Sequence, residues 1–262
     1  MLQFGGATGT LAALGNRGIE VGRALASELG LEYPGAPWHT HRDRPANLLC
    51  ACAVLTGTLG KMARDITLLM QNEVAELAEP GGSGRGGSST MPHKRNPIGS
   101  TIALASANRV PGLLSSFLAG MVQEHERGVG GWQSEWATVA AIVQATGAAL
   151  ASMTEVAEGF TIDPRRMQRN IEATRGLIFA ERAMMLLGPA LGRDVAHKLI
   201  EDAIRKSTAQ DRRLAEVLGE IREVSKALDP EVLARLESPE EYLGVAKEFR
   251  TSLLSGLPDP DK

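Results

Sequence analysis

Aromatic residues and cysteines are scarce in this sequence of 262 residues. Aromatics make up 4% and hydrophobic residues 43%, so a core has to be built from aliphatic side chains, as in packed helices. The two cysteines, Cys50 and Cys52, lie two positions apart in an apolar run. On a helix their side chains would diverge by roughly 200°, which makes a disulfide between them difficult. Two small buried thiols suit a reducing compartment, and we expect a cytoplasmic protein.

An excess of either charge is also absent. The 28 basic and 31 acidic residues give a net charge of -3, which excludes a general binder of nucleic acid or of anionic membranes. No stretch reaches the roughly 20 apolar residues of a membrane span, so none is expected. Met1 is followed by neither a basic region nor an apolar run, and therefore no signal peptide is predicted.

The apolar residues recur with the period of a helix. Steps of three and four mark long amphipathic helices over about 46–78, 98–121 and 132–156. Each exceeds the usual helix length of about 11 to 12 residues and has a long stripe to bury, which predicts a bundle shared between subunits. Shorter helical segments are predicted at about 164–174, 176–188, 193–207, 211–219 and 239–254.

No strand pattern of comparable strength appears, so the predicted fold class is all-α. We expect two domains. These are a central helical-bundle domain over 1–160, which carries the loop described next, and a small C-terminal helical domain over 161–262.

A glycine-rich loop joins the first two long helices. Gly82, Gly84 and Gly87 match a dinucleotide fingerprint, but they follow a helix rather than a strand, and Ser88 stands where a phosphate-binding P-loop needs lysine. The loop combines two serines with a lysine and an asparagine just before a predicted helix start, where unpaired amides favour a carboxylate. These residue types suit removal of a proton next to a carboxylate. They are equally compatible with a flexible linker that holds incidental polar residues.

The string from Gly87 to Pro97 decides between these interpretations. It resembles the G-S-S-x-M-P-x-K-x-N-P signature of the fumarase/aspartase superfamily at all eight fixed positions. The resemblance implies cofactor-free homotetramers without a metal, built on a shared bundle of long helices, with active sites drawn from three subunits. It also implies that Ser88 is the general base and that Lys94 and Asn96 bind the substrate and its aci-carboxylate intermediate. Ser89 is a further expected substrate contact.

Residues 91–97 narrow the resemblance to adenylosuccinate lyases and bacterial 3-carboxy-cis,cis-muconate cycloisomerases. Adenylosuccinate lyases place a glutamate four residues after the last proline of the signature, where this chain has Thr101. The segments 2–15, 36–44 and 123–136 also resemble the cycloisomerases more. The implied reaction is closure of a small tricarboxylate, 3-carboxy-cis,cis-muconate, to 4-carboxymuconolactone in protocatechuate (β-ketoadipate) degradation. The alternatives are an adenylosuccinate-lyase-like elimination and a catalytically incomplete structural fragment, because chains of the family are longer.

Further candidates lie outside the loop. Thr8 stands in a glycine-rich turn that lines the substrate site in relatives, although a tight turn alone would explain it. His39 and Arg42 are expected to contact a substrate anion, with packing at a helix start as the alternative. His39 and His41 have no acidic or cysteine partner at ligand spacing, so no metal site is predicted. The segment His125-Glu126-Arg127 fits salt bridges at a helix end as well as it fits a substrate contact.

Overall fold

The computed structural model describes residues 1–81, 91 and 94–256. In this part of the chain nearly all regular structure is helical, and the two strands have two residues each, so the all-α prediction is confirmed. The α-helices are α1 (Gly18–Glu28), α2 (Asp43–Leu69), α3 (Ile98–Ala119), α4 (Gly131–Gly159), α5 (Pro164–Ala173), α6 (Ala180–Leu191), α7 (Arg193–Gln210), α8 (Leu214–Gly219), α9 (Arg222–Ala227), α10 (Pro230–Ala234) and α11 (Ala246–Ser255). The other elements are the 3-10 helices η1 (Ala12–Arg17), η2 (Leu177–Phe179) and η3 (Pro239–Tyr242) and the strands β1 (Leu77–Ala78) and β2 (Thr161–Ile162).

The chain divides into two compact units, Met1–Asp163 and Pro164–Lys262. The sequence placed a domain boundary after residue 160, close to this division. Each unit has its own buried core and is described by itself.

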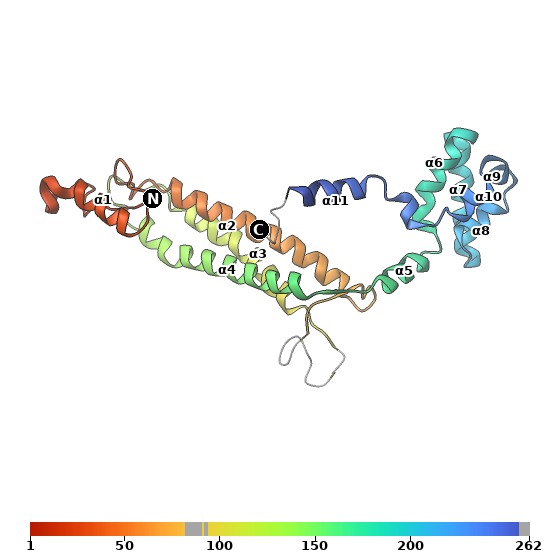
Figure 1. Cartoon of the computed structure of the whole chain (residues 1–262), viewed down its shortest axis with the longest axis horizontal. Coiled ribbons are helices and arrows are strands. Elements are labelled where there is room, and N and C mark those ends of the chain that lie inside the picture. Colours follow the sequence, from red (N-terminus) through yellow and green to blue (C-terminus); the bar gives the residue numbers. More distant parts are fainter. Residues whose placement is uncertain (82–90, 92–93, 257–262) are drawn as a thin grey trace. The chain divides into compact units, whose positions relative to one another are not determined.

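The first unit is built on three long helices. In Figure 1, α2, α3 and α4 lie lengthwise beside one another, and each contacts both of the others. Buried apolar side chains line their shared faces in two groups. One consists of Leu59, Ala63, Ile66, Ala103, Ala149, Met153 and Val156. The other consists of Ala46, Leu49, Val110, Phe117 and Ile142.

A glycine allows α2 and α3 to pack closely. A Cβ added to Gly60 on α2 would lie 2.5 Å from the Cβ of Ala107 on α3. Real Cβ contacts are essentially never that short, so a larger residue would force these two helices apart.

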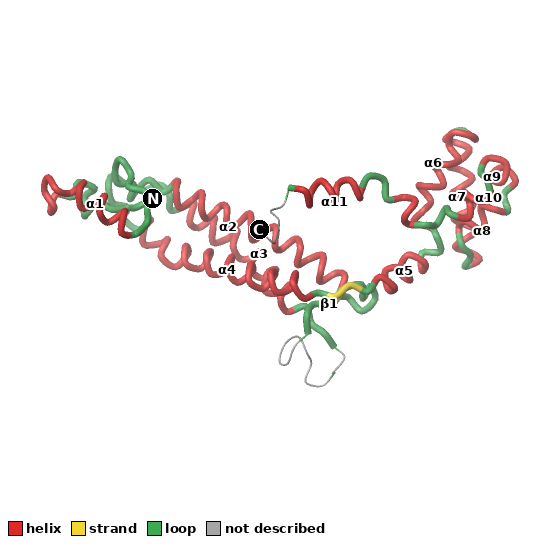
Figure 2. The backbone as a smooth tube through the Cα atoms, in the orientation of Figure 1, coloured by secondary structure: helices red, strands yellow, loops and turns green. Residues whose placement is uncertain are grey.

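The first bundle helix ends earlier than the apolar pattern predicted. The prediction of one helix over 46–78 is wrong, because α2 stops at Leu69 and a turn follows in which Ala75 adopts a positive φ of 53°. Leu77 and Ala78 then form β1, which pairs antiparallel with Ile162 and Thr161 of β2. Figure 2 shows β1 in yellow at the end of the bundle. Apolar spacing continued past the true helix end because the turn and strand also contain half-buried apolar side chains.

Two bundle helices are long and apolar enough to cross a membrane by length and composition alone, namely α2 and α4. The same test is passed by core helices of soluble proteins, and here both helices pack against α3. The expectation of no membrane span stays a prediction.

The second unit has a small core of its own around α6 and α7. Its fully buried members include Leu187, Ala196, Leu214, Leu218 and Leu236. Arg182 is only 7% exposed, and its Nη1 donates to three backbone carbonyls, those of Arg235 (2.7 Å), Leu236 (2.9 Å) and Ser238 (3.1 Å). This one guanidinium therefore fastens the segment after α10 onto α6.

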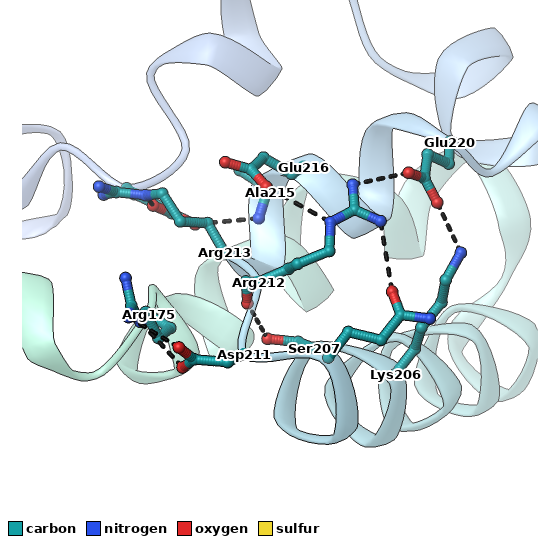
Figure 3. Close-up of polar contacts among 11 residues, drawn as sticks. Arg175, Lys206, Ser207, Asp211, Arg212, Arg213, Ala215, Glu216 and Glu220 are labelled. Carbon is teal, nitrogen blue, oxygen red and sulfur yellow. Dashed lines mark hydrogen bonds and ion pairs between the residues drawn. The ribbon is translucent and has the colours of Figure 1, made fainter.

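Exposed ion pairs join the end of α7 to α8 (Figure 3). Arg212 and Lys206 both donate to the carboxylate of Glu220, at 2.6 and 2.5 Å. Hydrogen bonds from Arg212 and then Lys206 lower the pKa of Glu220 to about 2. Asp211, with a positive φ of 50°, ends α7, so the helix predicted over 211–219 is α8 alone.

The end of the second unit also differs from the prediction. The single helix predicted over 239–254 is wrong, because η3 and α11 are separated by Gly244, which has a positive φ of 54°. The helices α9 and α10 are too short to show an apolar period, and the sequence did not reveal them.

Candidate active site

The signature loop returns to the bundle at the start of α3. Ser88 and Ser89 lie outside the described residues, whereas Lys94 and Asn96 are described. Lys94 is exposed, and its amide donates to the carbonyl of Met91 at 3.0 Å. Asn96 is half-buried, and its carbonyl accepts from the amide of Ile98 at 2.9 Å. The predicted cation and amide donor thus stand just before the first turn of α3.

The amides at the start of α3 already have acceptors. One carboxylate, that of Glu79, accepts from Gly99 and Ser100 at 2.9 Å each, and the amide of Thr101 donates to the carbonyl of Pro97. The sequence suggested that this helix start would hold a substrate carboxylate. That expectation needs correction, because a side chain of the protein itself occupies these amides. The anion-binding capacity of this end of the bundle therefore rests on side-chain cations.

A cavity of about 580 Å³ opens beside these residues. Both cations of the described loop residues, Lys94 and Arg95, line it. The remaining lining residues come from the end of α2, the turn, β1, β2 and the loop: Met70, Asn72, Ala75, Glu76, Leu77, Ala78, Met91, Thr161, Ile162 and Asp163. The cavity is large enough for a small polycarboxylate, and its lining holds two cations, Lys94 and Arg95, and two carboxylates, Glu76 and Asp163.

A second group of sequence-predicted segments gathers at the opposite end of the bundle. Arg127 donates from its guanidinium to the carbonyls of Gly6 (3.0 Å) and Ala7 (3.1 Å), and Thr40 donates its hydroxyl to the carbonyl of His125 (2.6 Å). The hydroxyl of Thr8 is exposed and lies 3.2 Å from that of Thr10. Three segments far apart in sequence, near residues 6–10, 38–42 and 123–135, therefore form one surface.

A buried ion pair lies beneath this surface. Arg42 donates from Nε (3.0 Å) and Nη2 (2.5 Å) to the two carboxylate oxygens of Glu135, and from Nη1 to the carbonyl of His39 (3.1 Å). Gln123 adds a third donor to Glu135 at 2.9 Å. The side chains of Arg42 and Glu135 are only 10% and 3% exposed. The guanidinium has its hydrogen-bond partners within the protein, and the predicted contact of Arg42 with a substrate anion stays a prediction.

His39 is enclosed by the same network. Its ring packs edge-on against Trp132 with a centroid distance of 5.0 Å, and its Nε2 is buried without a hydrogen-bond partner. Burial lowers the pKa of His39, and the charges of Arg127 and Arg42 lower it further, against an opposing contribution from Glu135. The imidazole is therefore neutral at pH 7 and shielded from solvent at Nε2. The predicted contact of His39 with a substrate anion stays a prediction.

The residues beside Lys94 and the residues around Thr8 cannot meet within one chain. Arg42 precedes the start of α2, whereas the cavity beside Lys94 begins at Met70, just after its end. A helix of 27 residues is about 40 Å long, so this distance separates them. Figure 1 shows α1 near one end of the bundle, and Figure 2 shows β1, which precedes the signature loop in the chain, at the other.

Within residues 1–81, 91 and 94–256, no group of three histidine, cysteine, aspartate or glutamate side chains is placed to hold a metal ion. The sequence predictions of no metal and no cofactor stay predictions.

Glu79, Gln123 and Glu135 were not assigned any role from the sequence. Gln123 and Glu135 lie in the segment 123–136 that resembles the cycloisomerases, and Glu135 offered one further signal. It is a carboxylate on a helix whose other buried positions are apolar or small, apart from Thr146. A charge in such a place normally has a buried partner.

The chain matches two family models. One, described as Lyase, matches residues 1–112, and one described as Adenylosuccinate lyase C-terminus matches residues 176–252. Together they cover most of the first unit, up to α3, and most of the second unit.

Named proteins resemble the chain over nearly its whole length. It is 48% identical over 98% of its residues to a 3-carboxy-cis,cis-muconate cycloisomerase of Bradyrhizobium diazoefficiens, and 48% over 95% to one of Pseudomonas aeruginosa. The crystal structure of a 3-carboxy-cis,cis-muconate lactonizing enzyme from Pseudomonas putida matches with a TM-score of 0.87 at 45% identity, covering 97% of this chain and 56% of that one. The chain spans 57% and 54% of the length of the first two relatives.

The long-helix bundle and its glycine-serine loop define the class as an all-α lyase scaffold. Within that class, the chain belongs to the fumarase/aspartase superfamily, as the signature had indicated. One family model is named after the C-terminus of adenylosuccinate lyase. The named relatives at 48% identity, however, are 3-carboxy-cis,cis-muconate cycloisomerases.

Proposed function

We propose that this chain forms the central and C-terminal parts of a cofactor-free cycloisomerase that closes 3-carboxy-cis,cis-muconate to 4-carboxymuconolactone. The observation that carries the proposal is the joint presence of the full signature over residues 87–97 and of 45–48% identity to four cycloisomerases over 87–98% of this chain. Such an enzyme acts on a small tricarboxylate and would belong to aromatic-compound degradation in the cytoplasm.

The proposed chemistry is an intramolecular addition. A carboxylate oxygen forms a bond to one carbon of a conjugated double bond, and the adjacent carbon takes up a proton. Ser88 moves that carbon proton, while the ammonium of Lys94 and the side-chain amide of Asn96 stabilise the enolate-like charge of the intermediate. Ser89 and Thr8 are proposed hydroxyl contacts to substrate carboxylates. His39 and Arg42 are proposed to shape the surface around Thr8 from beneath.

A complete site needs more than one copy of the chain. The Lys94 end and the Thr8 end of one bundle are about 40 Å apart, so a substrate that contacts both kinds of residue has to lie between different subunits. Large apolar side chains also face outward along the helices, among them Leu48 (61% exposed), Val54 (71%) and Trp136 (61%). We propose that other copies cover them in a homotetramer without nucleic-acid or membrane partners.

An adenylosuccinate-lyase-like elimination is the less supported alternative. Its supporting glutamate is replaced by Thr101, whose hydroxyl donates to the carbonyl of Pro97 at 2.6 Å. A threonine engaged in this way offers no carboxylate to a catalytic histidine.

The test is a lactonisation assay that follows the loss of muconate ultraviolet absorbance, with the mass of the assembly measured in parallel. Ser88→Ala should lower turnover by about 10²-fold to 10⁴-fold, the usual contribution of a positioned proton-transfer group. Ser116→Ala, which removes an exposed hydroxyl from α3, is the matched control. Near-normal turnover of Ser88→Ala would exclude this serine as the group that moves the carbon proton. A wild-type tetramer without turnover would favour the structural-fragment alternative.

A further inference from the structure

Glu79 joins the two ends of the signature loop. It follows β1 directly and precedes Pro80, the first residue of the loop segment. Its carboxylate reaches across to Gly99 and Ser100, twenty and twenty-one positions later, and accepts a hydrogen bond of 2.9 Å from each amide. One side chain therefore closes the base of a segment that contains Ser88, Lys94 and Asn96.

This carboxylate is held firmly by its surroundings. Glu79 is only 7% exposed, and it lies at the N-terminus of a helix of 22 residues, where the helix dipole favours a negative charge. Hydrogen bonds from amides to an ionised carboxylate are stronger than those between neutral groups. Its backbone follows residues that pair with β2 at the end of α4. Both ends of the loop are thus fixed to the same end of the bundle.

The packing around Glu79 leaves little room for movement. A Cβ on Gly99 would lie 2.4 Å from Val156, and a Cβ on Gly159 would lie 2.8 Å from Pro80. Glu79 and Asn96 line the same small cavity, of about 20 Å³, together with residues of α3 and α4. We therefore expect a shift of the Glu79 carboxylate to change the position of Asn96.

We infer that Glu79 is a positioning residue for the signature loop. It holds the start of α3 against β1 and thereby fixes where Lys94 and Asn96 stand relative to the bundle. Fixing both ends of a loop lowers the entropy cost of placing the groups that it carries. The part concerning catalysis rests on the proposed function, whereas the part concerning loop anchoring does not.

Limited trypsin digestion tests the anchoring without any need for activity. The peptide bond after Arg95, which joins it to Asn96, lies inside the segment that Glu79 closes. In Glu79→Gln the carboxamide keeps one acceptor but turns an NH₂ group toward a backbone amide, which removes one of the two bonds. We expect cleavage after Arg95 to become about tenfold faster, because cleavage follows local opening of the anchored base. Glu79→Asp, whose side chain is one methylene shorter, should also make cleavage after Arg95 faster.

Glu237 provides a matched control in the second unit. Its side chain is 8% exposed, and its carboxylate accepts from the amide of Ala215 near the start of α8 at 2.9 Å and from Arg213 at 2.6 Å. Glu237→Gln removes a similar cap away from the loop, so cleavage after Arg95 should stay within about twofold of wild type. Circular dichroism identifies variants that fail to fold. Wild-type cleavage rates in folded Glu79→Gln and Glu79→Asp would overturn the inference.

A kinetic readout separates positioning from general stability. Where the assembled wild type turns over, Glu79→Gln should lower kcat about tenfold or more and change KM less, because Lys94 and Asn96 act mainly on the intermediate. An unchanged kcat would overturn the catalytic part. Absence of wild-type turnover would count against the proposed function instead, and digestion would then decide the anchoring alone.

Discussion

The buried pair of Arg42 and Glu135 offers a quantitative test of how the Thr8 end of the bundle is held together. Arg42→Met keeps most of the side-chain volume but removes the guanidinium that gives Glu135 two of its three donors. Breaking one partner of a buried ion pair costs about 3–5 kcal/mol, because the remaining charge has no compensation. Glu135 is 3% exposed, so water cannot replace the lost donors without local opening.

The same reasoning predicts that a second substitution restores stability. In the double variant of Arg42→Met with Glu135→Met no charge is left buried, and apolar replacement of a buried ion pair is often neutral or stabilising. Gln123 then keeps one bond, from its Nε2 to the carbonyl of Gly120 at 3.1 Å. We therefore expect the double variant to recover at least about 2 kcal/mol relative to Arg42→Met.

Urea unfolding followed by tryptophan fluorescence measures both changes. The three tryptophans, Trp38, Trp132 and Trp136, all belong to the first unit, so the signal reports that unit. Arg23→Met, on an exposed face of α1, is the control and should change the free energy of unfolding by less than about 0.5 kcal/mol. Protein concentration is held constant, since assembly contributes to apparent stability. The reasoning fails if Arg42→Met costs under about 1 kcal/mol, or if the double variant is no more stable than the single one.

Two further predictions concern pH. The pKa of His39 is lower in the folded than in the unfolded state, so the unfolded state binds the proton more readily. The contribution of neutral His39 to the free energy of unfolding is therefore present above pH 6.5 and is lost as the pH falls below that value. His39→Phe should flatten this part of the stability profile, and an unaltered profile would contradict it. Glu220, with a pKa of about 2 against an ordinary 4.5, contributes stability above pH 4.5 that is lost as the pH falls to about 2. Carboxyl NMR titration of Arg212→Met should show the pKa of Glu220 rising toward 4.5, and no rise would exclude Arg212 as the main cause.

The helical architecture was readable from the sequence because helix faces repeat every 3.6 residues. That period located α2, α3 and α4 and most of the longer helices after residue 163. It could not locate the end of α2, where Leu77 and Ala78 continue an apolar pattern although they pair with β2. It also missed α9 and α10, which are shorter than two full periods.

The sequence by itself determined the superfamily and predicted the chemistry of the site, because the signature string carries specific side chains in a specific order. It named Ser88, Lys94 and Asn96, and it indicated the superfamily before any coordinate was known. Only the tertiary structure decided how their neighbours are used. Glu79, twenty positions before Gly99, accepts hydrogen bonds from the backbone amides that the composition of the loop had predicted to bind substrate. Arg42 is neutralised by Glu135, ninety-three positions away, and the Thr8 surface lies a full helix length from Lys94. Contacts over such separations depend on how the helices pack, and local sequence patterns carry no record of that packing.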